Sequence, residues 1–416
     1  SRGLGDVYKR QLFHLTDPRG ASDKSGRTFN NPYQYFFEQM HMDDAIYADE
    51  SIYEYPMQQG GGNDGRPYSF GRPSSGGSKA AYPCKSYGQG RINPAYFYGV
   101  FDPNDMRRDV SITMTGSNGK GVEKLIPFVP NSKAEGGGLT LNKWDENRQA
   151  NPWVAAQRKS GINGPYMRMS EVYLGYAEVC AALGDVVTGK QYLKTVRERS
   201  FPQGLANTDA FIASFGNDLV RAIIEERGFE YAGEGDRRWT LIRSGYLPED
   251  IKRIKDMTKA MMDGLATKGY YEFENGNIIS AYIWTKLVDA KTIYGHRLTA
   301  QCPTDKVNDP VLYPGWRGQK DNWEEMGLNY GSSTPATNLA IKGLFEIVSE
   351  EEAASLESQG YTKVNWGIDL VDNRDEYDKY LFWDYDYVSA PIYLWPFTPN
   401  VMAAGGFTNG YGFKQE

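Results

Sequence analysis

Apolar residues recur at three- and four-residue spacing in the middle of the chain, which predicts a helix over residues 164–185. Pro165 suits the first turn of that helix, and Gly184 is placed to stop it. The residues that set the spacing are Met169, Val172, Tyr173, Tyr176, Ala177 and Cys180. A second helix over 189–201 follows a short turn and is closed by Pro202. Two helices joined in this way pack as an antiparallel hairpin, the unit of tetratricopeptide-type repeats, although no clean 34-residue period continues through the rest.

Two further helices are predicted after this hairpin. The third begins near Thr208 or Asp209 and continues through FIASFGNDLVRAIIEERGFEYA. The fourth is DRRWTLIRS, with Asp236 as N-cap and Gly245 as C-terminal stop. The following segment, IKRIKDMTKAMMDGLATKG, is basic and amphipathic. Its lysines alternate with core-spaced apolar residues, which favours a solvated face over a membrane-surface helix.

Strand-like patterns flank the helices. ESIYEYPM (50–57) alternates between polar and apolar positions, and ENGNIISAYIWTKLVD (274–289) is also typical of a strand. FDPNDMRRDVSITMT (101–115) combines a turn, a short charged element and a β-like stretch.

Two long Gly- and Pro-rich segments, 60–90 and 306–331, carry aromatic side chains. In the first, tyrosines and Phe70 are interleaved with Arg66, Arg72 and Lys79. Flexible linkers seldom contain aromatics in this way, so we predict an ordered surface loop rather than a linker.

Composition excludes several classes of protein but does not indicate one function. A chain of 416 residues with 30 Tyr, 18 Phe and 9 Trp is aromatic-rich and, by length alone, could hold two or three domains. The net charge of −7 gives no broad basic face and argues against nucleic-acid binding. No window approaches the 18 consecutive apolar residues of a membrane span. The three cysteines lack C-x-x-C spacing, and the three histidines stand in no metal-ligating or triad frame, so no metal or cofactor is predicted.

The densest charge pattern is EERGFEYAGEGDRRWTLIRSG (225–245), which mixes five carboxylates and four arginines with large apolar residues. Two carboxylates at suitable separation hydrolyse glycosidic bonds, so catalysis is one interpretation. Adjacent carboxylates on a helix point in different directions and cannot face one substrate together. We therefore favour a partly buried ion-pair cluster that locks one helix to the next, with Phe229 and Trp239 packed around it. The residues of this structural motif are Glu226, Arg227, Glu230, Asp236, Arg237 and Trp239.

Loop aromatics beside arginines and amides are typical of a glycan site. Sugar rings stack their C–H faces on aromatic rings, and their hydroxyls need donors and acceptors. The helically spaced Tyr173, Tyr176 and Trp239 are predicted to lie in the core. The loop residues are predicted to bind ligand: Tyr68, Tyr82, Tyr87, Arg91, Tyr313, Trp316 and Trp323.

Four ordered motifs resemble the C-terminal part of the SusD/RagB family of nutrient-binding outer-membrane lipoproteins from Bacteroidetes. They are GPYMRMSEVYLGYAEVCAALGD, VRERSF, AIIEERGFEYAGEGDRRWTLIRSG and YLWPFTPN. FDPNDMRRD is similar to the Asp-x-Arg segment that precedes the repeats in that family. The resemblance covers about Glu50 to Gly412. Departures from the family pattern occur at Trp239-Thr240, at Phe397-Thr398 and in TNGYG near the C-terminus.

The resemblance implies a mainly α fold: a tetratricopeptide-like helical scaffold with long irregular loop-rich insertions and a few short strands. It also implies a non-catalytic, lipid-anchored protein that faces outwards, covers a SusC-like TonB-dependent transporter and hands over an oligosaccharide. The helices would face the transporter and the loops the ligand. Alternatives are a peptide-binding member of the family, a glycoside hydrolase and a helical scaffold without a pocket.

The first residues of the chain and the family resemblance together suggest how the chain is organised. SRGLGDVYKRQ is similar to translated adapter read-through, so we expect 1–19 to be a non-native or disordered leader, and the family's lipidated cysteine and first repeats to be missing. Residues 20–150 would form a loop-rich region that faces the ligand, and 151–250 the helices. Residues 251–416 would be the C-terminal, loop-rich part of the same domain.

Overall fold

The structure is a computed structural model, and it describes residues 15, 32–39, 50–55, 57–58, 70–71, 90–117, 123–126, 138–144, 161–289, 337–372, 374, 393, 397–406 and 408. The helices in these ranges are α2 (Pro32–Gln39), α4 (Pro94–Gly99), α5 (Arg107–Ser111), α6 (Met169–Ala182), α7 (Val186–Arg199), α8 (Thr208–Ala213), α9 (Leu219–Glu230), α10 (Asp236–Ser244), α11 (Leu247–Lys268), α13 (Glu350–Ser358), α14 (Ile368–Asp372) and α16 (Pro399–Gly405). The strands are β1 (Ser51–Tyr55), β2 (Arg91–Ile92), β3 (Ile112–Thr113), β4 (Thr115–Ser117), β5 (Glu123–Leu125), β6 (Leu139–Leu141), β7 (Gly164–Arg168), β8 (Tyr270–Glu272), β9 (Ile278–Ser280), β10 (Tyr282–Asp289), β11 (Thr337–Lys342) and β12 (Thr362–Asn365).

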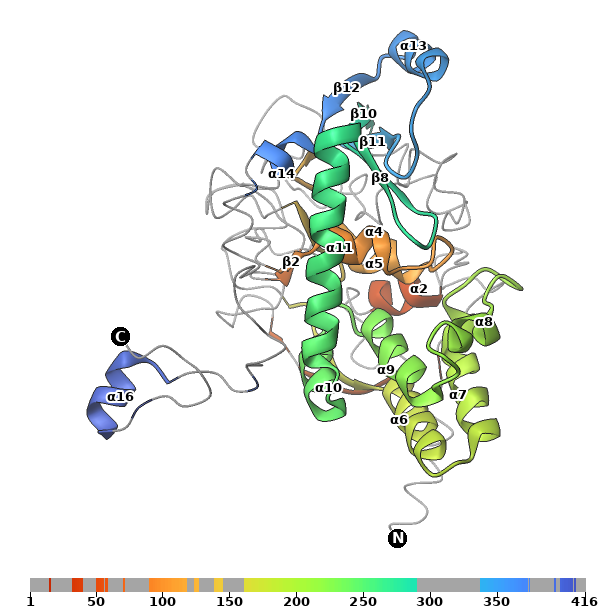
Figure 1. The fold of residues 1–416 in the computed structure, drawn as a ribbon, viewed down its shortest axis with the longest axis vertical. Helices are drawn as coiled ribbons and strands as arrows, with labels where there is room; N and C mark the ends of the chain where they lie inside the picture. The colour runs from red at the N-terminus through yellow and green to blue at the C-terminus, as the bar shows by residue number, and fades with distance from the viewer. Residues whose placement is uncertain are drawn as a thin grey trace.

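Helices dominate the described residues, so the predicted mainly α class is confirmed. Helices α6 and α7 form the expected antiparallel hairpin (Figure 1). Small Ala177 on α6 lies in a buried apolar cluster with Leu193 and Val196 of α7 and with Leu219 and Ile223 of α9. This hairpin with α8 and α9 makes the tetratricopeptide-like part, and the long α11 extends away from it (Figure 1).

The start of the first predicted helix is wrong. Residues Gly164–Arg168 form β7, which pairs antiparallel with β1, and Pro165 stands opposite Glu54 in that pairing. Helix α6 begins only at Met169. Proline lacks an N–H but is tolerated where no ladder bond is needed, so the same residue fits a short two-stranded sheet.

Other boundaries also differ from the sequence prediction: α7 begins at Val186 and ends at Arg199, whereas the sequence predicts 189–201. The third helix is broken into α8 and α9 by a turn in which Gly216 and Asn217 have φ of 64° and 66°. Asp236 is the first residue of α10 and not its N-cap; Gly235, with φ of 96°, takes that position. Asp218 caps α9 by accepting a hydrogen bond from the Arg221 backbone N–H, so α9 has its own start signal.

The strands form small sheets around a second buried cluster. Strand β10 lies between β11 and β12, and β6 lies between β2 and β3; β1–β7, β4–β5 and β8–β9 are two-stranded. The largest apolar cluster draws on α4, β3, β10, β11 and α11, with Phe97, Ile112, Ile283, Ile341 and Met261 among its members. The strand predicted within 50–57 is present as β1, and the strand-like segment 274–289 contains β9 and β10.

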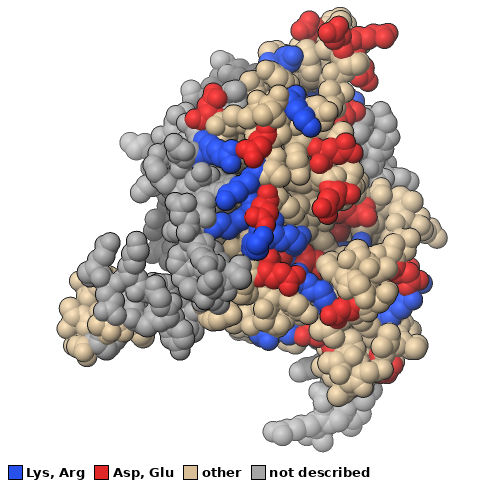
Figure 2. All heavy atoms as spheres, in the orientation of Figure 1, with Lys and Arg blue, Asp and Glu red and all other residues tan. Residues whose placement is uncertain are grey.

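Charges of both signs are interspersed over the face that carries α11 (Figure 2). Its side chains include Lys252, which pairs with Asp256, and Arg253, which pairs with Asp250. Helix α11 thus presents the solvated face that the sequence favours. Within the described ranges, no helix is both long enough and apolar enough to cross a membrane.

Candidate functional site

The predicted ligand-binding side chains are not among those that the structure describes. Tyr68, Tyr82, Tyr87, Tyr313, Trp316 and Trp323 lie outside the described residues. The backbone of Arg91 belongs to β2, but its side chain is also outside the described set. Their role in binding stays a prediction.

The structure does show how the two predicted ligand loops are held at their ends. The segment 290–336 connects β10 to β11, and Asp289 pairs with Thr337 across these strands. The segment 56–90 runs from β1 to β2, and the described Phe70 and Leu141 lie against Gly90 at its end. Both loops therefore leave from paired strands, which fixes where their ends lie.

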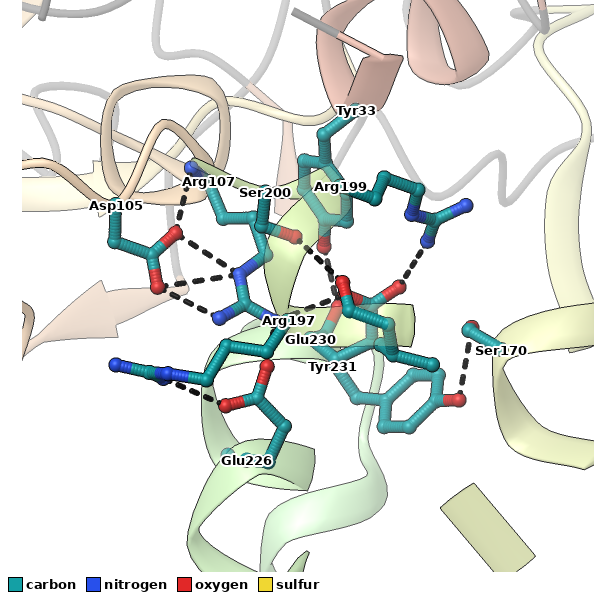
Figure 3. Close-up of polar contacts among 12 residues, drawn as sticks. Tyr33, Asp105, Arg107, Ser170, Arg197, Arg199, Ser200, Glu226, Glu230 and Tyr231 are labelled. Atoms are coloured by element: carbon teal, nitrogen blue, oxygen red, sulfur yellow. Dashed lines mark hydrogen bonds and ion pairs between the residues drawn. The ribbon is translucent and has the colours of Figure 1, made fainter. Parts of the chain in front are cut away.

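The charged run forms a buried ion-pair cluster with residues from five other parts of the chain, and Figure 3 shows some of its contacts. We call it the Glu230 cluster. Its cationic side chains are Arg107, Lys143, Arg168, Arg197 and Arg199, and its carboxylates are Glu50, Asp105, Glu226, Glu230 and Glu234. Five positive and five negative charges balance, as burial away from water requires.

Glu230 lies at the centre and is fully buried. Its carboxylate accepts hydrogen bonds from Arg168 Nη1 at 2.5 Å, Arg199 Nη2 at 2.7 Å and Arg107 Nη1 at 3.0 Å. Its backbone oxygen accepts from the Tyr33 hydroxyl on α2 and from Arg168 Nη2 at 2.7 Å. One residue of α9 therefore joins α2, α5, α7 and β7.

Arg107 joins this centre to the start of α5. Its guanidinium donates to both oxygens of Asp105, at 2.9 and 2.7 Å, and Nη1 donates to Glu226 at 2.7 Å. Glu226 also accepts from Arg197 of α7 at 2.8 Å. Glu226 and Glu230, one helical turn apart on α9, share Arg107. The Asp-x-Arg segment noted in the sequence is thus one side of this cluster.

Glu234 extends the cluster to Lys143, which lies two residues after β6. It accepts from Lys143 Nζ at 2.6 Å and from Arg168 at 2.9 and 3.0 Å. Burial lowers the pKa of Lys143 to about 8, despite the opposing effect of Glu234. Lys143 also faces the rings of Tyr33 and Phe37 on α2, at 5.0 and 4.8 Å. Helix α2 is therefore held against the turn between α9 and α10 that contains Gly233 and Gly235, which we call the signature turn.

The electrostatics of the Glu230 cluster suit support and not acid–base chemistry. Burial acts to raise the pKa of Glu230, but Arg168, Arg199 and Arg107 outweigh it and hold that pKa well below its usual range. Burial likewise acts to raise the pKa of Glu234, but Arg168 and Lys143 outweigh it, so that pKa is lowered. A glycosidase needs one carboxylic acid with a raised pKa. These carboxylates stay ionised and acceptor-only, which argues against catalysis by the run.

A second charged junction links α9, α10 and α11. Arg237 donates to Glu225 at 2.8 Å and to Asp250 at 3.0 Å, and Arg253 donates to the same two carboxylates. Arg227 pairs with Asp236 at 2.5 Å. Of the predicted motif residues, Glu226 and Glu230 therefore belong to the Glu230 cluster. Arg227, Asp236 and Arg237 instead make contacts that join α9, α10 and α11.

Two aromatic predictions are wrong. Trp239 is 56% exposed and does not pack around the charges, because α10 turns Thr240 and Leu241 inward and Trp239 outward. Tyr176 is 49% exposed on the outer face of α6. Phe229, in contrast, is buried among apolar residues as expected.

Most ion pairs of the cluster could not be predicted from the sequence. Arg168 and Arg199 lie 62 and 31 residues from Glu230, Lys143 lies 91 residues from Glu234, and Glu50 lies 118 residues from Arg168. The signal that could have found Arg168 is its place at the end of a strand, directly before α6. Within the described residues, no group of three His, Cys, Asp or Glu side chains is arranged to hold a metal ion.

The signature turn also contacts the base of the first loop. Gly233 has φ of 82°, and a side chain there would place its Cβ 2.4 Å from Cδ2 of Leu141; one at Gly90 would lie 2.7 Å from Cδ1 of the same leucine. Leu141 of β6 is thus wedged between the turn and residue 90, where the first loop ends.

We expect Gly233→Ala to reduce the free energy of unfolding by about 2 to 4 kcal/mol, since it combines a left-handed backbone with overpacking. Gly204→Ala is the matched control, because Gly204 also has φ of 82° but no atom within 4 Å. It should cost about 1 to 2 kcal/mol. Urea unfolding measures both; equal losses would show that the contact with Leu141 contributes nothing.

Comparisons with known proteins show the family of this chain. The model of the SusD family matches residues 11–396. The chain belongs to the SusD family. It is 28% identical over 160 residues to the SusD-like protein P25 of Formosa agariphila, which is 38% of this chain and 26% of that protein.

Two solved structures are similar to part of this chain. A SusD homolog from Bacteroides thetaiotaomicron matches with a TM-score of 0.40 and 19% identity, over 56% of this chain and 48% of that one. Surface glycan-binding protein A from the same species, in complex with laminarihexaose, matches with a TM-score of 0.38 and 18% identity, over 58% and 50%. The chain spans half or less of the length of each of these proteins.

Proposed function

We propose that this SusD-family chain binds an oligosaccharide at the outer face of the outer membrane, does not cleave it, and delivers it to a SusC-like TonB-dependent transporter. The observation that carries the proposal is the family match over residues 11–396. A lipid anchor of the kind found in the family would hold the protein at the membrane.

The charge arrangement supports binding without catalysis. The carboxylates of the signature run are committed to arginines and lysine inside the protein, as shown for Glu226, Glu230 and Glu234. The ligand is therefore expected at the loop residues Tyr68, Tyr82, Tyr87, Arg91, Tyr313, Trp316 and Trp323. Their aromatic rings suit sugar C–H faces.

The outer face of α6 supports contact with a transporter. Val172, Tyr176, Val179 and Leu183 recur at helical spacing and are all exposed, Leu183 by 81%. Contiguous exposed apolar surface marks interaction sites in soluble proteins. Co-purification of the membrane-anchored protein with a TonB-dependent transporter tests this part; recovery without any such protein would contradict it.

Affinity electrophoresis of the wild-type chain in gels that contain single polysaccharides tests ligand binding. We expect slower migration with at least one glycan and no release of reducing ends. Release of reducing ends would indicate a hydrolase. Binding to peptides and to no glycan would favour a peptide ligand, and binding to neither would favour a scaffold.

A further inference from the structure

Three tyrosines lie exposed on the β1–β7 sheet, at positions where a surface strand usually carries polar residues. Tyr53 and Tyr55 are each 56% exposed, and Tyr166 is 70% exposed. The opposite face of the sheet is buried through Ser51, Glu54 and other residues. We call the three rings the tyrosine platform.

The platform has a defined geometry. Tyr53 and Tyr55 are both exposed and lie on either side of the buried Glu54, so their side chains leave the same face of β1. The Tyr53 and Tyr166 rings meet edge to face, with centroids 5.7 Å apart. The register of the pairing shifts around Tyr53, and both Tyr166 and Met167 reach the surface.

Hydrogen bonds fix the strand beneath the rings. Asn163 Nδ2 donates to Glu54 Oε2 at 2.9 Å, and Asn163 Oδ1 accepts from the Met57 backbone N–H at 2.9 Å. This amide therefore holds the end of β1 on both sides of Tyr55. On the other strand, Arg168 is tied to the Glu230 cluster. Preorganised aromatic groups lose little entropy when a ligand binds.

The platform carries no exposed charge of its own. Glu54 and Arg168 are the charged residues of β1 and β7, and they are 6% and 1% exposed. What remains at the surface is aromatic carbon and phenolic hydroxyl, which can stack on a sugar ring and exchange hydrogen bonds with its hydroxyls. A neutral ligand suits this surface better than an anionic one.

Size favours a sugar over a protein partner. Five residues of strand span about 17 Å, and the two strands lie about 5 Å apart. A specific protein interface needs roughly 800 Å² on each partner, which is far more than this sheet offers. The strand β1 also leads directly into the segment 56–90, where Tyr68 lies. The platform is thus continuous along the chain with the predicted ligand loop.

From these observations we infer that Tyr53, Tyr55 and Tyr166 form a stacking subsite for neutral oligosaccharide. The inference rests on the proposed glycan-binding function and adds to it the chemical class of the ligand and three residues that the sequence did not single out.

The test compares the full chain with Tyr53→Ala, Tyr166→Ala and the double variant, in gels with a neutral glucan, a mannan, a xylan, a polygalacturonate and a sulfated galactan. Tyr282→Ala is the matched control, because Tyr282 is a 42% exposed tyrosine on the separate strand β10. We expect wild type and control to be retarded by at least one neutral glycan. The double variant should bind it about tenfold more weakly, with the same thermal melt as the control.

Each other result has a distinct meaning. Wild-type affinity in the double variant, for a glycan that the wild type retains, overturns the subsite and leaves the proposed function standing. Retention of charged glycans alone overturns the neutral class. No retention of the wild type by any glycan overturns both proposals. Loss of co-purification with the transporter, at unchanged glycan affinity, would make the platform a protein contact and overturn the subsite.

Discussion

Replacement of Glu230 by glutamine should reduce the free energy of unfolding by about 3 to 5 kcal/mol, the loss typical of breaking a buried charge network. Glutamine keeps the shape of glutamate but offers one acceptor oxygen without charge. Three guanidinium groups, of Arg107, Arg168 and Arg199, would lose their shared counter-charge inside the protein. Urea unfolding followed by circular dichroism measures the change.

Glu198→Gln is the control for this substitution. Glu198 on α7 forms an ion pair with Lys194 at 3.5 Å, with both side chains about half exposed. Exposed pairs of this kind contribute about 0.5 kcal/mol or less. A loss below about 1 kcal/mol in Glu230→Gln, or equal losses in the two variants, would contradict a structural role for the cluster.

The free energy of unfolding should fall as the pH drops below about 4.5, because the buried carboxylates of the two charged clusters take up protons when the chain unfolds. The pKa values of Glu230, Glu234 and Asp250 are held below their usual ranges, because neighbouring arginines and Lys143 outweigh the effect of burial. A carboxylate with a lowered pKa in the folded state stabilises that state above its unfolded pKa, which is 4.5 for glutamate. This stability is lost as the pH falls toward the folded pKa, because the unfolded chain binds the protons first.

With about two protons taken up on unfolding, the free energy of unfolding should fall by roughly 2 to 3 kcal/mol for each pH unit below that point. Urea melts at pH 7, 5, 4 and 3 measure the slope. Glu234→Gln should show a shallower slope, since it lacks one of the protonated groups. A flat profile from pH 7 to 3 would contradict the lowered pKa values.

The sequence predicted local structure well where periodicity and turn residues agree. The α6–α7 hairpin, α10, and the strands β1 and β10 follow from spacing and stop signals. It failed where the decisive contact lies elsewhere in the chain. The strand Gly164–Arg168 is set by pairing with β1, more than 100 residues earlier, and the α8–α9 break depends on the left-handed Asn217.

The same limit applies to the charged run. Its composition shows that ion pairs are needed, but local neighbours satisfy only some of them, such as Arg227 with Asp236. Glu230 finds its partners at positions 107, 168 and 199, which sequence spacing alone cannot indicate. Trp239 shows the reverse error, since helical spacing does not say which face of α10 is covered.

The charged signature supports the fold, whereas the aromatic loops are the proposed ligand-binding site. Two variants test this division. Arg237→Lys removes the planar fork that joins Glu225 and Asp250 and should lower the free energy of unfolding by about 1 to 3 kcal/mol. Trp316→Ala, or Tyr82→Ala, should leave the thermal melt nearly unchanged.

The most direct measurement is the Kd of each fully folded variant for a glycan that the wild type retains. We predict a wild-type Kd for Arg237→Lys and a Kd raised about tenfold or more for Trp316→Ala. A raised Kd in Arg237→Lys with an unchanged melt, together with a wild-type Kd in Trp316→Ala, would contradict the account and place the ligand at the charged signature.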